Sequence, residues 1–190
     1  MLILALGAIA VLSPIVAWRW PAGLLQNTWR WPLLIWATLL LQFVALQLSM
    51  PHAVAAALHV FTYVSAIAFL WLNRKFPGVI LVGIGALSNG LVIALNGGTL
   101  PASASAVERA GRGATPEFAN SAVLENPVLP WLGDFFAWPA PMPLANTFSI
   151  GDVLIIAGVF VAAWSGSQRI PWPKITEPPQ EPHPVGDVSR

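Results

Sequence analysis

Long apolar stretches alternate with polar connections along the chain. Each stretch lies within a few residues of the ~20 that an α-helix needs to cross a bilayer. The stretches that we predict to span the membrane are residues 2–16, 33–50, 53–72, 78–95 and 149–165. We therefore predict an all-α fold: a polytopic membrane helix bundle of about five transmembrane helices, with residues 1–167 as the membrane domain.

Two signals mark where these helices begin and end. Pro51 ends the second stretch, because proline cannot continue the helical hydrogen-bond pattern. The second and third stretches therefore form a tight antiparallel hairpin. Ser149 and Asp152 have the spacing of a capping box at the start of the fifth stretch.

The fourth stretch is rich in small residues. Gly83, Ala86 and Gly90 stand at helical spacing, so we predict that they line one face. Small residues on one face let the backbone of a neighbouring helix come close. This stretch is the candidate for the central helix of the bundle.

The remaining segments are a long loop and a tail. Residues 96–148 form a polar, proline-containing outer loop between the fourth and fifth predicted spans. Residues 168–190 form a proline-rich tail, whose composition predicts an extended conformation with polyproline II character. With no Lys or Arg ahead of the first apolar stretch, we expect that stretch to be a retained span rather than a secretory signal.

Composition excludes several classes of protein. Hydrophobic residues make up 56% of the chain and charged residues only 9%, against roughly 25% charged in soluble domains. The net charge of +1 lacks the positive excess that nucleic-acid binding needs. Cysteine is absent, which excludes disulfides, thiolate metal sites and iron–sulfur clusters.

Basic residues predict the orientation. With the N-terminus outside and the C-terminus cytoplasmic, seven Lys and Arg residues lie inside and two outside, in keeping with the positive-inside rule. The inside set is Arg19, Arg30, Arg74, Lys75, Arg169, Lys174 and Arg190; the outside set is Arg109 and Arg112. We therefore place the protein in a bacterial cytoplasmic (inner) membrane.

Three polar residues in the predicted spans are candidate site residues. His59 is either a hydrogen-bonding group between helices or a ligand of a pigment or haem. Asn89 and Asn96 are candidates for a polar pocket, but amides inside a membrane also bridge helices. Asn96 further begins an Asn-Gly-Gly helix exit, in which glycine supplies the left-handed conformation.

Asp134, Asn146 and Asp152 are the polar candidates of the loop and the fifth span. Paired carboxylates can bind a cation or transfer protons, yet capping already explains Asp152. The sequence holds no Walker loop, zinc-protease motif or nucleophile elbow. We therefore predict no catalytic residue and no metal site.

An aromatic and proline-rich run forms the candidate partner interface. Such a strip either packs on the protein's own helix ends or binds the bilayer interface or a partner. The residues that we name for it are Trp131, Phe135, Phe136 and Trp138, together with Trp172 of the tail.

Three motifs carry a resemblance to a known family. They are Asn96-Gly97-Gly98 with Pro101, Leu132-Gly133-Asp134, and the run from Pro141 to Asp152 that reads P-x-P-L-x-N-x-F-S-x-G-D. The sequence resembles a family of small, uncharacterised bacterial integral membrane proteins, a domain of unknown function. The resemblance implies a five-span bundle with the motif loop folded between spans four and five, and it implies no activity. Leu100 stands where the family usually has methionine.

Three hypotheses for the function remain. The first is a non-catalytic accessory subunit of a larger respiratory or photosynthetic membrane complex, whose partners are the bilayer and other membrane subunits. The second is a small-molecule carrier or binding protein with a site between the fourth span and the outer loop. The third is a membrane enzyme that uses Asp134 or His59. No cofactor is required by the sequence; lipid, quinone and tetrapyrrole all stay open.

Overall fold

The computed structural model describes residues 2–47, 51–111 and 121–171, and these are mostly helical. The α-helices among them are α1 (Leu2–Val16), α2 (Ala22–Leu25), α3 (Pro32–Gln47), α4 (His52–Leu72), α5 (Val79–Leu95), α6 (Ala104–Arg109) and α7 (Ile150–Trp164). The short strands are β1 (Arg19–Trp20), β2 (Leu100–Pro101), β3 (Ser121–Ala122), β4 (Phe136–Trp138), β5 (Asn146–Phe148) and β6 (Gln168–Arg169), with a 3₁₀ turn at Pro130–Leu132.

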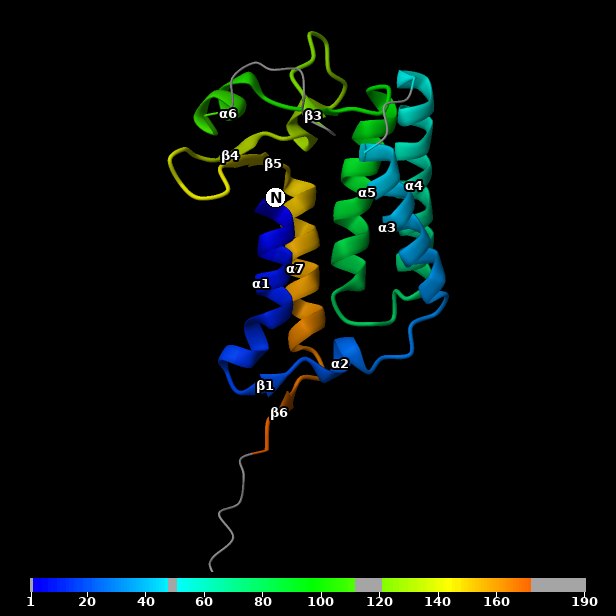
Figure 1. The fold of residues 1–190 in the computed structure, drawn as a ribbon, viewed down its shortest axis with the longest axis vertical. Helices are drawn as coiled ribbons and strands as arrows, with labels where there is room; N and C mark the ends of the chain where they lie inside the picture. The colour runs from blue at the N-terminus through cyan, green and yellow to red at the C-terminus, as the bar shows by residue number, and fades with distance from the viewer. Residues whose placement is uncertain (1, 48–50, 112–120, 172–190) are drawn as a thin grey trace, which may run out of the picture.

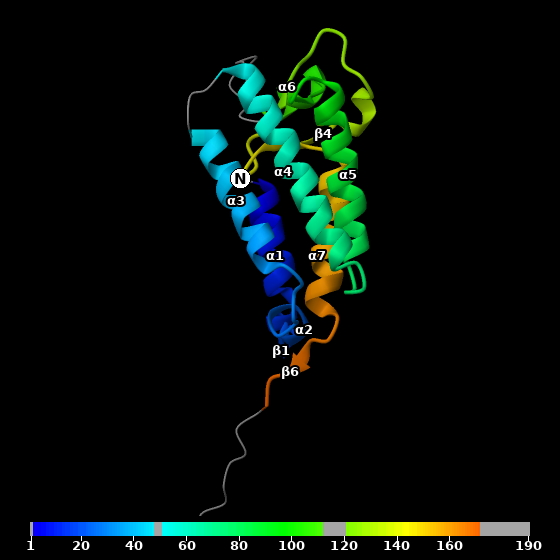
Figure 2. The same ribbon diagram turned by 90° about the vertical axis from the view of Figure 1, so that its right-hand side faces the viewer.

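Five long helices run up and down in alternation to form the bundle (Figure 1). They are α1, α3, α4, α5 and α7, and each overlaps one of the five predicted apolar stretches, with α3 and α4 beginning one residue earlier than predicted. Helix packing follows the order α3, α4, α5, α7, α1, with the most extensive contact between α5 and α7. The start of α1 and the described parts of the loop, residues 96–111 and 121–149, lie at one end, the loop end, while β6 lies at the other (Figures 1 and 2).

Among the described residues, one helix is long and apolar enough to span a membrane by length and composition. It is Ala53–Leu72, with a mean hydropathy of 2.0, and only 22% of its apolar window is buried. Leu2–Val16, Pro32–Phe43, Val79–Leu95 and Ile150–Trp164 are shorter apolar helices. Since the core helix of a soluble protein is mostly buried, a long apolar helix with so little buried surface suggests a membrane location.

Side chains on the outside of the bundle are larger than many of those between its helices. Large apolar side chains are exposed on all five long helices, for example Leu4, Trp36, Phe61, Ile80 and Phe160. Most of the buried residues of α5 and α7 are small, although Val92 and Ile93 are buried as well. The small ones are Gly85, Ala86, Gly90, Gly151, Gly158, Ala162 and Ala163. This arrangement is typical of helices that associate within lipid.

Glycines set the close approach of α5 and α7. A Cβ atom added at Gly85 would lie 2.4 Å from the Gly151 carbonyl oxygen, and one at Gly158 would lie 2.6 Å from the Gly78 carbonyl oxygen. Gly90 contacts the Tyr63 ring of α4 instead. The prediction that Gly83 shares this packed face is wrong, because nothing lies within 4 Å of a Cβ built there. Gly85, two positions along, carries the contact.

Short strands organise the loop end, and the sequence analysis did not predict them. β2 pairs with β3 in parallel, β4 pairs with β5 antiparallel, and Ala102 forms an isolated bridge with Asp134. Strands of two or three residues are too short to show an alternating pattern. The loop is therefore folded back over the ends of α5 and α7 (Figure 1).

The opposite end is tied together by side chains that bind backbone. Arg19 donates from Nε to the Ser167 hydroxyl at 2.8 Å and from Nη2 to the Ser167 carbonyl at 2.6 Å, beside the β1–β6 pair. Asn73, at the end of α4, binds both the N–H and the carbonyl of Arg30, at 2.8 and 3.1 Å. Because five of the described cations lie here, we name this the basic end; they are Arg19, Arg30, Arg74, Lys75 and Arg169.

The glycine contacts predict a difference between two neighbouring substitutions. Gly85→Ala places a methyl group against the α7 backbone and is expected to destabilise the fold by about 1–3 kcal/mol. Gly83→Ala is the matched control; it meets open space, and the better helix propensity of alanine makes it neutral or stabilising by up to about 1 kcal/mol. Denaturant unfolding of the purified protein measures both. Equal losses of stability would contradict the close α5–α7 contact.

Candidate functional site

Polar side chains gather where the first turn of α7 meets α5, directly beneath the loop. Asn89 of α5 is 2% exposed. Its Nδ2 donates to Asp152 Oδ1 at 3.0 Å, and its Oδ1 accepts from the Ser149 hydroxyl at 2.9 Å. The predicted capping box is confirmed, because Ser149 and Asp152 each bind the other's backbone N–H. Asn89 thus joins the cap of α7 to the middle of α5.

Gly151 makes this junction possible. A Cβ atom at this position would lie 2.0 Å from Asn89 Oδ1. Any side chain there would push the first turn of α7 off α5. In the third motif, Gly151 therefore allows α7 to approach α5 closely, and Asp152 caps α7.

Asp134 is a buried carboxyl group held by the loop. It is 7% exposed, and Thr147 Oγ1 donates to its Oδ2 at 3.1 Å. Its backbone N–H donates to the Pro101 carbonyl and its carbonyl accepts from Ser103. Burial raises the pKa of Asp134 to about 6; the negative charge of Asp152 adds to the rise, and the Thr147 hydrogen bond opposes it. Such a carboxyl group can exchange a proton near neutral pH.

Asn96 fastens the far side of the loop to the end of α5. Its Nδ2 donates to the Val128 carbonyl at 2.9 Å, and its Oδ1 accepts from the Val128 N–H at 2.8 Å. It also binds the Val92 carbonyl one turn back, at 2.7 Å. Gly97 and Gly98 follow with positive φ values of 67° and 94°, which close the helix as glycine does.

His59 connects α4 to the start of the loop. Its Nδ1 lies 3.0 Å from the Gly98 carbonyl oxygen, and because a carbonyl only accepts, Nδ1 carries the proton in this arrangement. The side chain is 8% exposed, with the Tyr63 ring 5.6 Å away between centroids. Among the described residues no group of three His, Cys, Asp or Glu side chains could hold a metal ion.

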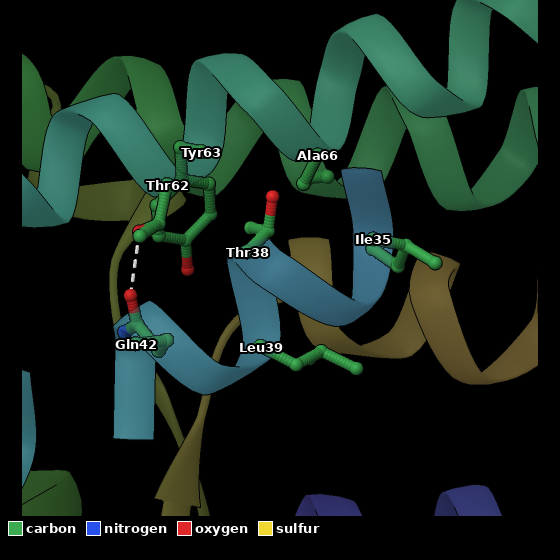
Figure 3. Close-up of a pocket in the computed structure, with 8 residues that line it drawn as sticks. Ile35, Thr38, Leu39, Gln42, Thr62, Tyr63 and Ala66 are labelled. Carbon is green, nitrogen blue, oxygen red and sulfur yellow. Dashed lines mark hydrogen bonds between the residues drawn. The ribbon is translucent and has the colours of Figure 1, made fainter. Parts of the chain in front are cut away.

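A pocket of about 200 Å³ lies between α3, α4 and α5 (Figure 3). Thr62 Oγ1 donates to Gln42 Oε1 at 2.5 Å across it. Tyr63 also lines it, together with Ile35, Thr38, Leu39, Ala66 and Ala86. Sequence reasoning missed Tyr63; the one signal was that it is the single tyrosine of the chain.

The aromatic residues of the loop are largely exposed. Trp131 is 63% and Phe135 is 52% exposed, and Phe136 and Trp138 are also on the surface. Strand β5 holds the strip in place, since Phe136 stacks on Phe148 at 5.4 Å between ring centroids and Trp138 pairs with Asn146 across β4–β5. Trp172, the fifth predicted interface residue, lies outside the described residues, as do residues 48–50 of the second predicted span and 172–190 of the tail.

The structure therefore separates the predicted site residues into three groups. Asn89 and Asp152 meet at the α5–α7 junction; Asp134 and Asn146 lie in the loop above it; His59 and Asn96 hold the loop to α4 and α5. All of these contacts join one part of the chain to another.

Comparison with known proteins gives a family without an activity. Residues 26–164 match a family of unknown function, DUF5317. An uncharacterised protein of Thermotoga maritima is 33% identical over 95 residues, which are 49% of this chain and 54% of that protein. The chain thus spans about half the length of this curated relative. No solved structure matches.

The junction predicts different effects on stability for two adjacent substitutions. Asn89→Ala removes the acceptor of the Ser149 hydroxyl and the donor to Asp152 Oδ1, while the two hydrogen bonds of the capping box remain, so we expect a loss of about 2 kcal/mol of stability. Ser88→Ala is the control, because the Ser88 hydroxyl is buried without a partner and its removal costs nothing. Thermal unfolding reads out both. An unchanged Asn89→Ala would show that the junction does not stabilise the fold.

The raised pKa of Asp134 predicts a pH dependence of stability. Its ordinary value is 3.8 and its folded value about 6, so the folded state binds the proton more tightly. The stabilising contribution is complete below pH ~4 and is lost as the pH rises through about 6; two pKa units correspond to about 3 kcal/mol. In Asp134→Asn, the midpoint of unfolding should depend less on pH between about 4 and 6 than it does in the wild type. An unaltered slope in the variant would assign the pH dependence to other groups.

Proposed function

We propose a role for this chain, which belongs to the family of unknown function DUF5317. It is a five-span integral membrane protein and serves as a non-catalytic accessory subunit of a larger bacterial membrane complex, respiratory or photosynthetic. The observation that carries the proposal is the exposed aromatic strip on a loop in which Asn96 and Asp134 are already hydrogen-bonded to other loop residues.

Insertion of the whole bundle is supported by its surface. The apolar side chains exposed on α1, α3, α5 and α7 resemble those on α4, which is long enough to span by itself. Helices of 15 to 17 residues extend about 23–26 Å at 1.5 Å per residue, which is less than the ~30 Å hydrocarbon core. Local thinning of the bilayer and interfacial tryptophans accommodate a difference of this size.

Charge supports an orientation with the loop outside. Of the described residues, five of the six cations lie at the basic end, whereas Glu108, Glu125, Asp134 and Asp152 all lie toward the loop end. The positive-inside rule then puts the basic end and the C-terminus in the cytoplasm and the N-terminus outside, in the inner membrane.

The way in which the strip is held supports partner binding at the loop. Asn96 hydrogen-bonds to both backbone groups of Val128, Thr147 donates a hydrogen bond to Asp134, and β4 pairs with β5. The aromatic side chains are therefore presented on a preformed surface, which reduces the entropy lost on association. Trp and Phe are also the residues that commonly dominate binding energy when a partner buries them.

The two other hypotheses have less support. For a small-molecule binding protein, Asn89, Asn96 and Asp134 already bind this chain, so the pocket beside Tyr63 and Gln42 is the better candidate site. For an enzyme, Asp134 has a pKa suited to proton transfer, but a substrate would first have to displace the loop that covers it.

Native electrophoresis of membranes in a mild detergent tests the proposal. We expect the chain to migrate with larger membrane subunits, identified by mass spectrometry of the band, and an absorption spectrum of the same band reveals any haem or pigment. Migration alone, at its own 20.3 kDa plus detergent, would contradict the accessory role.

A loop variant locates the contact. Trp131→Ser combined with Phe135→Ser should reduce co-migration at least tenfold, because it removes most of the exposed aromatic area. Val123→Ser is the control, an exposed apolar residue of the loop outside the strip. Co-migration that survives the double variant would place the partner contact elsewhere.

A further inference from the structure

A second groove, of about 240 Å³, lies between α4 and α5 near the basic end. Aliphatic side chains of both helices line most of it, with Gly83 of α5 among them and Arg74 at the end of α4. The groove faces the same surroundings as the exposed apolar surface, since Ile80 and Leu87 line it and are also exposed. It combines an apolar slot with a cation.

Gly83 keeps the slot open. It is a helical glycine with no packing partner, because nothing lies within 4 Å of a Cβ built on it. The slot is lined on α5 from Val79 to Leu87, which corresponds to about 12 Å along the helix axis. That length is less than half of the ~30 Å hydrocarbon core, so the slot lies within one leaflet.

Arg74 is oriented but not neutralised. Its guanidinium lies 4.4 Å from the centre of the Trp71 ring, and its Nη1 donates to the Trp71 carbonyl at 2.8 Å. Within the described part of the chain, no other hydrogen bond of this guanidinium is found. Stacking on an indole leaves the edge of the planar group free to donate to an anion.

The described connections at the basic end contain further cations and no carboxylate. Lys75 follows Arg74 directly, and the Asn73 clamp brings the backbone of Arg30 to the end of α4. In the described connections at the basic end, residues 17–31, 73–78 and 165–171, no residue is acidic. The charge that complements this corner therefore has to come from outside these segments.

We propose that the α4–α5 groove binds an anionic phospholipid of the cytoplasmic leaflet. One acyl chain lies in the slot along Gly83, and the headgroup phosphate accepts hydrogen bonds from Arg74 next to Trp71. A soluble anion would leave the apolar slot empty, and a zwitterionic lipid would leave the excess positive charge uncompensated. This inference rests on the proposed membrane insertion and adds the class of lipid that the protein selects.

Lipid titration followed by native mass spectrometry tests the site on the full chain in detergent. The probes are dioleoyl phosphatidylglycerol, dioleoyl phosphatidylcholine with the same chains, and glycerol phosphate without chains. We expect phosphatidylglycerol to bind at least tenfold more tightly than phosphatidylcholine, and glycerol phosphate not to compete. Equal binding of the two lipids, or competition by glycerol phosphate, would overturn the proposal.

Two variants separate the two parts of the site. Arg74→Gln should remove the preference for phosphatidylglycerol, while Arg109→Gln at the loop end should keep it. Gly83→Leu fills the slot and should weaken binding of phosphatidylglycerol at least tenfold; Gly7→Leu is its control, since Gly7 also has nothing within 4 Å of a built Cβ. Wild-type binding in either test variant would overturn its half of the proposal.

Extraction of membranes at alkaline pH, run on each variant, separates failure of this inference from failure of the proposed function. A protein released into the soluble fraction contradicts membrane insertion itself. A protein retained in the membrane without a preference for phosphatidylglycerol contradicts only the lipid site.

Discussion

The contact between α5 and α7, closed at one end by Asn89, is the constraint on which the rest of the structure depends. Glycines at 85, 151 and 158 remove side chains from this interface, so the two backbones lie close together. Asn89 then supplies the one amide that can bind both members of the capping box at once. The C-terminus of α5 and the N-terminus of α7 lie at the same end of this pair, so the two ends of the connecting loop are close together. The loop therefore begins and ends over the same pair of helices.

The loop and the opposite end use the same device to satisfy backbone groups outside regular structure. Asn73 and Asn96 each cap the C-terminus of a helix, bind the carbonyl one turn back, and bind both backbone groups of a residue far away in sequence. A side-chain amide has an N–H donor and a carbonyl acceptor, as a peptide group does. Each asparagine can therefore bind both backbone groups of one residue, as a residue on a neighbouring β-strand would. Placing these amides at the ends of α4 and α5 fastens non-helical segments at both ends of one helical hairpin.

Sequence alone predicted the parts of this protein that depend on local signals. Five apolar stretches located the long helices, and Ser149 with Asp152 located the start of α7. The motif residues Asn96, Gly97 and Gly98 were assigned to a helix exit, which the structure bears out. What failed depends on the rotation of one helix against another: Gly83 was assigned to the packed face that Gly85 occupies. The partners of Asn89, His59 and Asp134 come from the path of the loop, and no periodicity in the chain encodes that path.

The two ends of the bundle satisfy their polar groups in opposite ways, and this difference decides what each can recognise. At the loop end Asn89 binds Asp152 and Thr147 binds Asp134, while aromatic side chains are exposed on the surface. At the basic end the cations hold backbone or stand exposed, with no described carboxylate beside them. An association at the loop end would be governed by buried apolar area, which salt screens little, whereas one at the basic end would be electrostatic and would weaken as ionic strength rises. The partner protein and the charged lipid that we propose would therefore bind at opposite ends of the bundle, without competing for the same residues.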